Sequence, residues 1–260
     1  MTVLPPLRPR MLFNYSTRLT GKSRSDESNL ALGAWLALVA GMVNSGGYLA
    51  FKTYTSHMTG LVSSMADNLV LGEFNLVSGV AIAVFSFLLG AMSTAILVSF
   101  ARRRALESLY AFPLLLEAML LLVFGAMSSS VAVGSPFFWV SGVAVLAYMM
   151  GLQNAVITKV SGAVVRTTHV TGMITDLGIE LGKLVYRNAG AREGQLPVFA
   201  DRRKLMALTR LIGSFFVGGV VGAIGFLQLS VWFVLPISAL LFLLAIGPVC
   251  RDISAWHSQK

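Results

Sequence analysis

Residues 211–250 read LIGSFFVGGVVGAIGFLQLSVWFVLPISALLFLLAIGPVC, and none of them is charged. A membrane-spanning helix needs about 20 predominantly apolar residues. The stretch is therefore long enough for two spans if the chain turns at Gln228-Leu229-Ser230. It predicts a helical hairpin that crosses a lipid bilayer twice.

The composition of the whole chain agrees with a membrane protein. Of its 260 residues, 56% are hydrophobic and 12% are charged. Soluble domains carry about 25% charged residues, and half that share does not cover a water-facing surface of this size. These proportions argue against a soluble enzyme, a coiled coil and a disordered chain.

The net charge of +9 does not indicate a nucleic-acid partner. The basic residues lie in the tails and between the apolar runs, where Lys and Arg set membrane orientation. Aromatic residues are not interleaved with them to stack on bases. Cys250 is the single cysteine, so no disulfide within the chain and no cysteine-based metal site is expected. We expect neither a metal nor a cofactor.

Four more runs are apolar and long enough to span, and they complete a set of six. Only one of the six, Leu109–Val131, contains a charged residue, Glu117. Two shorter and more polar segments, His57–Leu71 and His169–Tyr186, lie between the runs. The predicted spans are Leu30–Phe51, Leu76–Phe100, Leu109–Val131, Phe137–Thr158, Leu211–Leu227 and Val231–Cys250.

Charge counting indicates that the two polar segments do not cross the membrane. With the N-terminus inside and six spans, only Lys52 of the 20 Lys and Arg residues lies outside. If both polar segments crossed, six basic residues would lie outside, including Arg102-Arg103-Arg104. The positive-inside rule favours the first arrangement. It predicts cytoplasmic polar tails at 1–29 and 251–260 and an inner basic loop at 183–204.

The chain also contains an internal repeat. Each half holds three predicted spans, an odd number, so the second half enters the membrane in the opposite orientation to the first. The sequence thus predicts an all-α polytopic membrane protein with two inverted three-helix repeats, 30–131 and 132–250, each with a short polar interrupted or re-entrant helix. Four matches occur in the same order in the two halves: Gly41–Asn44 with Gly151–Asn154, Ser56–Gly60 with Thr168–Gly172, Ser86–Gly90 with Ser214–Gly218, and Pro113 with Pro236.

The polar segments are the candidate solute site. Their Thr-Gly pairs suit a turn into a short helix, whose N-terminal end favours an anion or a substrate oxygen. Histidine titrates near neutral pH, and ionisable residues at membrane depth point to function. Glu117 is a candidate proton relay. The predicted pathway residues are Asn44, His57, Thr59, Gly60, Asp67, Asn154, Arg166, His169, Thr171, Gly172 and Asp176.

The same residues also have a purely structural interpretation. Polar side chains can hold membrane helices together by hydrogen bonds worth roughly 0.6–2 kcal/mol each. Asn44 and Asn154 can satisfy the backbone of broken helices, and Glu117 can pair with an arginine of the 102–104 cluster. Two small-xxx-small pairs are typical of close helix packing, within the chain or between subunits: Gly178 with Gly182, and Gly218 with Gly222.

Three motifs resemble the YoaK-like family of bacterial inner-membrane proteins: Met58-Thr59-Gly60, Gln153-Asn154-Ala155 and Arg166–Gly172. The resemblance covers nearly all of the chain after Leu30. It implies a bacterial inner membrane and this architecture, but no biochemical activity. The chain differs from the family at Asn44, where an aspartate is usual, and at Leu61, where an asparagine is common.

We therefore expect a transporter or channel-like permease for a small polar or anionic solute, and not an enzyme. One alternative is a scaffold or sensor that docks a cytoplasmic partner through the basic tail and the 183–204 loop. Another is an intramembrane enzyme that uses His57 or His169 as a base. The expected partners are the lipid bilayer, an unidentified small solute and a second copy of the chain.

Overall fold

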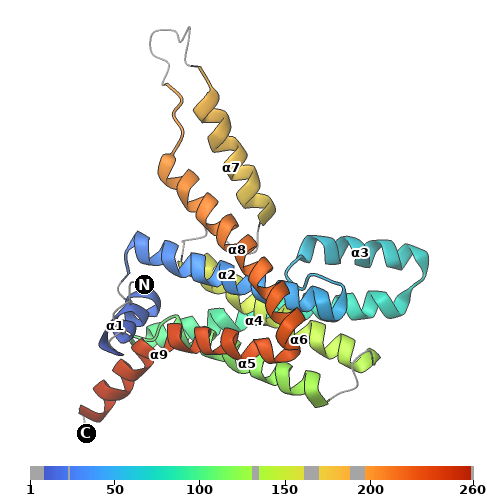
Figure 1. Cartoon of the computed structure of the whole chain (residues 1–260), viewed down its shortest axis with the longest axis horizontal. Coiled ribbons are helices and arrows are strands. Elements are labelled where there is room, and N and C mark those ends of the chain that lie inside the picture. Colours follow the sequence, from blue (N-terminus) through green and yellow to red (C-terminus); the bar gives the residue numbers. More distant parts are fainter. Residues whose placement is uncertain (1–8, 23, 131–134, 161–169, 188–196, 259–260) are drawn as a thin grey trace.

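The computed structural model describes residues 9–22, 24–130, 135–160, 170–187 and 197–258, and regular structure in these residues is helical (Figure 1). The elements are α1 (Pro9–Thr20), α2 (Asp26–Phe51), α3 (Met58–Leu71), α4 (Phe74–Arg103), α5 (Ala111–Ser130), α6 (Pro136–Val160), α7 (Val170–Val185), α8 (Arg202–Leu229), the 3₁₀ turn η1 (Ser230–Phe233) and α9 (Val234–Ser258).

The long helices make the chain an integral membrane protein. Five stretches are long and apolar enough to cross a bilayer: α2, α4, α6, most of α5, and Arg202–His257. The last stretch contains α8, η1 and α9 in succession, so its helical course changes at Ser230, beside the predicted turn. The polar helices α3 and α7 have 14 and 16 residues, which is short of a span.

Helices α2 and α8 cross at a glycine contact. A Cβ atom on Gly41 would collide with the backbone carbonyl of Phe215, and one on Gly218 would collide with that of Leu38. Gly222 likewise has the backbone of Met42 against it. The small-xxx-small pair predicted at 218 and 222 is therefore confirmed as a site of close helix packing.

Helices α4 and α6 cross in the same manner. A Cβ atom on Gly90 would collide with the backbone carbonyl of Tyr148, and one on Gly151 with that of Phe87. The sequence matches pair Gly151 with Gly41 and Gly90 with Gly218. Matched glycines thus occupy both crossings, and each crossing joins one half of the chain to the other.

Helix α1 packs on α9 and α2 within the segment expected to be a polar tail. The hydroxyls of Ser16 and Thr20 donate hydrogen bonds of 2.8 and 2.9 Å to the carbonyl oxygen of Leu244. In a regular helix this oxygen would accept from the residue four positions later, but that residue is Pro248, which has no N–H. Helix α1 therefore satisfies a carbonyl that the proline leaves free.

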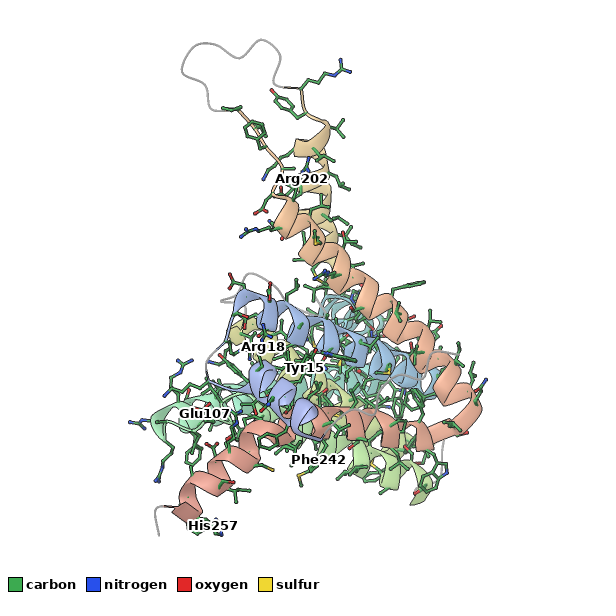
Figure 2. All side chains as sticks on the ribbon, turned by 60° about the vertical axis from the view of Figure 1, so that its left-hand side comes forward. Tyr15, Arg18, Glu107, Arg202, Phe242 and His257 are labelled. Atoms are coloured by element: carbon green, nitrogen blue, oxygen red, sulfur yellow. The ribbon has the colours of Figure 1, made fainter. Side chains whose placement is uncertain are left out.

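The triple-arginine turn lies at the same end of the helical bundle as the C-terminus of α9. The Asp252 carboxylate accepts hydrogen bonds of 2.8 and 2.9 Å from the backbone N–H groups of Glu107 and Ser108, just after Arg102–Arg104. Figure 2 shows Arg18, Glu107 and His257 at this end. This placement agrees with the charge counting, which puts these groups on one side of the membrane.

Candidate functional site

The connection between α2 and α3 folds back into the helical bundle. Helix α2 ends at Phe51, where Lys52 adopts a left-handed conformation with φ of 56°. The Ser56 hydroxyl then donates a hydrogen bond of 3.1 Å to the side-chain oxygen of Asn44. Asn44 precedes the end of α2 by seven residues, or about 10 Å of helix. The α2–α3 connection therefore returns alongside α2, and α3 starts about two turns back from the end of that helix.

The two halves of the chain line one cavity of about 1250 Å³. The first half contributes residues from α2, the α2–α3 connection, the start of α3 and α4. The second half contributes residues from α6, the start of α7 and α8. The lining residues are Gly41, Asn44, Ser45, Tyr54, Ser56, His57, Met58, Thr59, Phe87, Ala91, Ala95, Asn154, Ala155, Thr158, Lys159, Val170, Thr171, Ile212, Phe215, Phe216, Gly219, Val220 and Ala223.

Most of this lining consists of matched positions of the repeat. The matches already found in the sequence place residues of the two halves in register. The cavity contains both members of each resulting pair: Asn44 with Asn154, Ser45 with Ala155, Met58 with Val170, Thr59 with Thr171, Phe87 with Phe215, Ala91 with Gly219, and Ala95 with Ala223.

Some polar groups of the lining bond to helix backbone. The hydroxyl of Ser45 donates to the carbonyl of Gly219 at 2.8 Å and joins α2 to α8. The side-chain nitrogen of Asn154 donates to the carbonyl of Met150 at 2.9 Å, and Thr158 donates to the carbonyl of Asn154 at 2.7 Å. Both bonds lie within the continuous helix α6.

Asn44 differs from its counterpart. Its side-chain oxygen accepts from Ser56, and in the described part of the chain no group accepts a hydrogen bond from its side-chain nitrogen. The residue is 8% exposed and lines the cavity. Asn44 therefore offers the cavity a buried hydrogen-bond donor.

The charge of the described lining is positive. Lys159 lies near the end of α6, is exposed, and lines the cavity. No carboxylate is among the lining residues within the described ranges. The first turns of α3 and α7 also face the cavity through Thr59 and Thr171, and helix N-termini carry partial positive charge.

Several predicted pathway residues lie away from this lining. Gly60 borders a second, smaller hollow of about 390 Å³, and the imidazole of His57, which lines both spaces, lies where a Cβ on Gly60 would be. Asp67 is exposed, two turns further along α3. Gly172 follows Thr171 in α7 without joining the lining. Arg166 and His169 fall outside the described residues.

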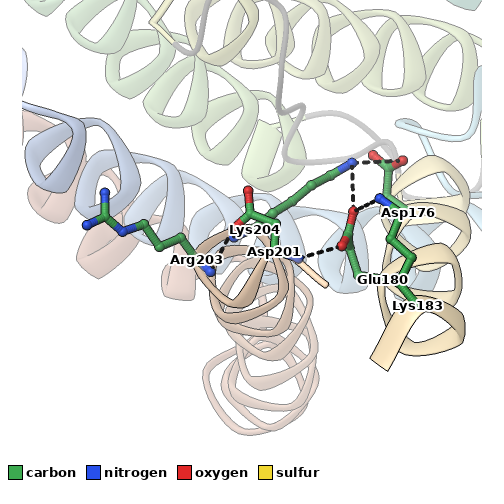
Figure 3. Close-up of polar contacts among 6 residues, drawn as sticks. All are labelled: Asp176, Glu180, Lys183, Asp201, Arg203 and Lys204. Carbon is green, nitrogen blue, oxygen red and sulfur yellow. Dashed lines mark hydrogen bonds and ion pairs between the residues drawn. The ribbon is translucent and has the colours of Figure 1, made fainter. Parts of the chain in front are cut away.

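Asp176 takes part in an ion-pair cluster on the α7–α8 hairpin, which projects away from the other helices (Figures 1 and 3). Its carboxylate lies 3.4 Å from the Lys204 ammonium. Glu180, 2% exposed, accepts from the Lys183 ammonium at 2.9 Å and from the backbone N–H of Asp201 at 2.8 Å. These two hydrogen bonds lower the pKa of Glu180. Asp176 therefore lies in the contact between α7 and α8.

Asp201 begins α8 at the same cluster. Its carboxylate accepts hydrogen bonds from the backbone N–H groups of Arg203 and Lys204 at 2.9 and 3.0 Å. The hydrogen bond from the Lys204 N–H lowers the pKa of Asp201 the most, and the bond from the Arg203 N–H lowers it further. The acid thus caps the helix that carries half of the cavity's apolar lining.

Glu117 lies in the contact between α5 and α6 and not in the cavity. It is 1% exposed, and its carboxyl accepts a hydrogen bond of 3.0 Å from the side-chain nitrogen of Gln153. Among the ion pairs of the described residues none joins Glu117 to Arg102–Arg104, so that alternative is wrong. The role of Glu117 as a proton relay stays a prediction.

The cavity contains residues that the sequence argument did not select. Tyr54, Phe87 and Phe215 line it although none was chosen as a pathway candidate. Both phenylalanines belong to the Ser-Phe-x-x-Gly match, which was treated only as evidence of a repeat. The repeat itself could have indicated them, because matched residues of the two halves can face the same space.

Comparison with known proteins identifies one match. Residues 32–247, from α2 into α9, match a family model described as "Protein of unknown function (DUF1275)". No curated protein matches the chain, and no solved structure matches it.

Proposed function

Since the chain belongs to the DUF1275 family, whose description states no function, we propose a function from its cavity: a membrane transporter or channel-like permease for a small polar or anionic solute. The observation that carries this proposal is the set of matched residues from both halves that line one space. Several transporter families bind their solute at the interface between two repeats, beside discontinuous helices.

The proposed architecture has six spans in two inverted repeats, with α2, α4 and α5 in the first and α6, α8 and α9 in the second. Helices α3 and α7 are the re-entrant segments. The indole N–H of Trp139, near the start of α6, donates to the carbonyl of Phe51 at the end of α2, at 3.3 Å. The start of one matched helix therefore lies at the end of the other, as inverted repeats require.

The proposed orientation places both termini in the cytoplasm of a bacterium whose inner membrane holds the protein. The support is the position of Arg102–Arg104 beside Asp252, because basic turns favour the cytoplasmic side. The end of α6, with Lys159, then faces the same side. In this orientation Lys159 attracts anions at the inner mouth of the cavity.

Alternating access would follow from movement of one helix pair against the other. The pairs α2–α8 and α4–α6 are each held by backbone contact at glycines, so each moves as a unit. Asn44, Thr59 and Thr171 donate hydrogen bonds to the solute between the pairs. In this proposal His57, which lines the same cavity, carries a proton.

Cysteine accessibility tests whether the cavity is a pathway. Cys250 is replaced by serine, and single cysteines are introduced as Asn44→Cys and Asn154→Cys in lipid vesicles. We expect a membrane-impermeant thiol reagent to label both positions. Val221→Cys, on an exposed face of α8 outside the lining, is the control and should stay unlabelled in lipid. If neither cavity position reacts from either side, the space is sealed and the permease proposal fails.

A further inference from the structure

Helices α4 and α8 line the cavity with apolar residues alone, and the polar lining residues come from other elements. None of the residues that α4 and α8 contribute has a polar side chain, and they include Phe87, Phe215 and Phe216. The polar groups come from α2, α6, the α2–α3 connection and the first turns of α3 and α7. A ligand with a polar end and an apolar body suits this lining, because a wholly polar solute would leave hydrogen bonds unmade against α4 and α8.

The polar groups favour an acceptor with negative charge. Asn44 has its oxygen bonded to Ser56 and offers its N–H group. Thr59 and Thr171 stand in first helical turns, whose backbone N–H groups have no partner within the helix. Lys159 adds one full positive charge, and the described lining has no carboxylate to oppose it.

The volume favours an organic ligand. At about 1250 Å³ the cavity exceeds the range of roughly 300–1,000 Å³ that is usual for small-molecule sites. A halide or sulfate ion would occupy a small part of it and would leave the phenylalanines of α4 and α8 without contact. A dicarboxylate would bring a second negative charge against the one lysine of the described lining.

We infer that the solute of the proposed permease is an amphipathic organic anion with one carboxylate and an apolar body, such as an aromatic or short aliphatic monocarboxylate. Its carboxylate lies toward the donor groups of α2, α3, α6 and α7, and its apolar body lies against α4 and α8. This inference rests on the proposed function and names the class of solute for the same cavity.

Binding to the full chain in lipid nanodiscs tests the class, since detergent is itself amphipathic. Calorimetry with benzoate, hexanoate, benzamide and sulfate is expected to show binding of the two carboxylates. Benzamide, the neutral counterpart, and sulfate should bind at least about tenfold more weakly, because benzamide lacks the negative charge and sulfate lacks the apolar body.

Two variants separate the charge from the apolar contact. Lys159→Gln should weaken benzoate binding about tenfold and leave benzamide unchanged, because only the carboxylate carries charge. Phe87→Ala should weaken both ligands together. Lys22→Gln, at an exposed lysine of the α1–α2 turn outside the cavity, is the matched control and should change neither.

The outcomes distinguish this inference from the proposed function. Equal binding of benzamide and benzoate, displacement of benzoate by equimolar sulfate, or binding of neither carboxylate would overturn the solute class. Any of these results is compatible with a cavity that thiol reagents reach, in which case the permease proposal stands. A sealed cavity would overturn both. Lys159 is exposed, so its replacement does not depend on repacking of the core.

Discussion

The side-chain nitrogen of Gln153 donates a hydrogen bond of 3.0 Å to the Glu117 carboxyl, in the buried contact between α5 and α6. The oxygen of the same Gln153 amide is buried and has no hydrogen-bond partner in the described structure. At this contact the Gln153 nitrogen has a hydrogen-bond partner and the Gln153 oxygen has none, although the side chains of Gln153 and Glu117 are adjacent.

We predict that Glu117→Gln is at least as stable as the wild type. A glutamine keeps the acceptor for the Gln153 nitrogen and adds an N–H donor for the Gln153 oxygen. Glu117→Leu removes both and should cost about 1–3 kcal/mol, because a buried amide is left unpaired. Thermal unfolding in nanodiscs measures the difference. If Glu117→Gln is the less stable of the two variants, the carboxyl has a role that an amide cannot fill.

Removal of the hydroxyls that bond to Leu244 should destabilise the packing of α1. The double variant Ser16→Ala/Thr20→Val is expected to lower stability by about 1–3 kcal/mol, since interhelical hydrogen bonds in membranes average roughly 0.6 kcal/mol and reach about 1.7. Protease cleavage within α1 should become faster. Ser254→Ala is the control, because its hydroxyl bonds only within α9. Unchanged cleavage in the double variant would mean that α1 is held by its apolar contacts alone.

Glycine substitutions should separate the helix crossings from the hairpin. Gly41→Ala and Gly151→Ala place a methyl group against backbone, and we expect each to cost about 1–3 kcal/mol. Gly178→Ala is the matched control, because a Cβ there has nothing within 4 Å, and it should stabilise α7 by about 0.5–1 kcal/mol. Chemical denaturation in mild detergent measures all three. The prediction is contradicted if Gly41→Ala and Gly178→Ala have the same effect.

The α7–α8 hairpin should loosen in acid. Hydrogen bonds from Lys183 and from the Asp201 backbone hold the pKa of Glu180 below its ordinary value of about 4.3. The stabilisation is present above that ordinary value and is lost as the pH falls through the lower folded pKa. Hydrogen bonds from the backbone N–H groups of Lys204 and Arg203 also lower the pKa of Asp201, so its contribution to the same cluster is lost in the same direction.

Hydrogen exchange of α7 and the first turns of α8 tests this expectation between pH 7 and pH 3. Exchange, corrected for its intrinsic pH dependence, should rise in the wild type at the acid end. Glu180→Gln keeps the shape of the side chain but cannot ionise, so it should raise exchange at pH 7 and flatten the profile. A pH profile that is identical in the two proteins would remove Glu180 from the stability of the hairpin.

The apolar helices and the repeat in the sequence could be predicted because both depend on local signals. An uncharged run such as 211–250 predicts its helices by length, and the matched glycines 41, 151, 90 and 218 recur at the helix crossings. The polarity of residues 57–71 likewise distinguished α3 from the long apolar helices. These signals depend on the composition of each segment, which a single sequence shows directly.

The other features of the fold could not be predicted, because they depend on contacts between residues that are distant in the sequence. The acceptor left free by Pro248 could be noticed in the sequence, but nothing there indicates that Ser16 and Thr20 satisfy it from more than 220 residues away. Gly178 and Gly182 carry the small-xxx-small pattern, yet the described part of the chain brings no atom within 4 Å of a Cβ at either position. Spacing shows that packing is possible, and only the fold shows where it occurs.

The bond between Thr20 and Leu244 also sets an order of events during synthesis. Helix α1 leaves the ribosome 224 residues before the carbonyl that it bonds, since chains emerge N-terminus first. Until α9 is made, the hydroxyls of Ser16 and Thr20 lack this acceptor. A chain that ends before residue 244 would therefore lack the carbonyl to which α1 bonds.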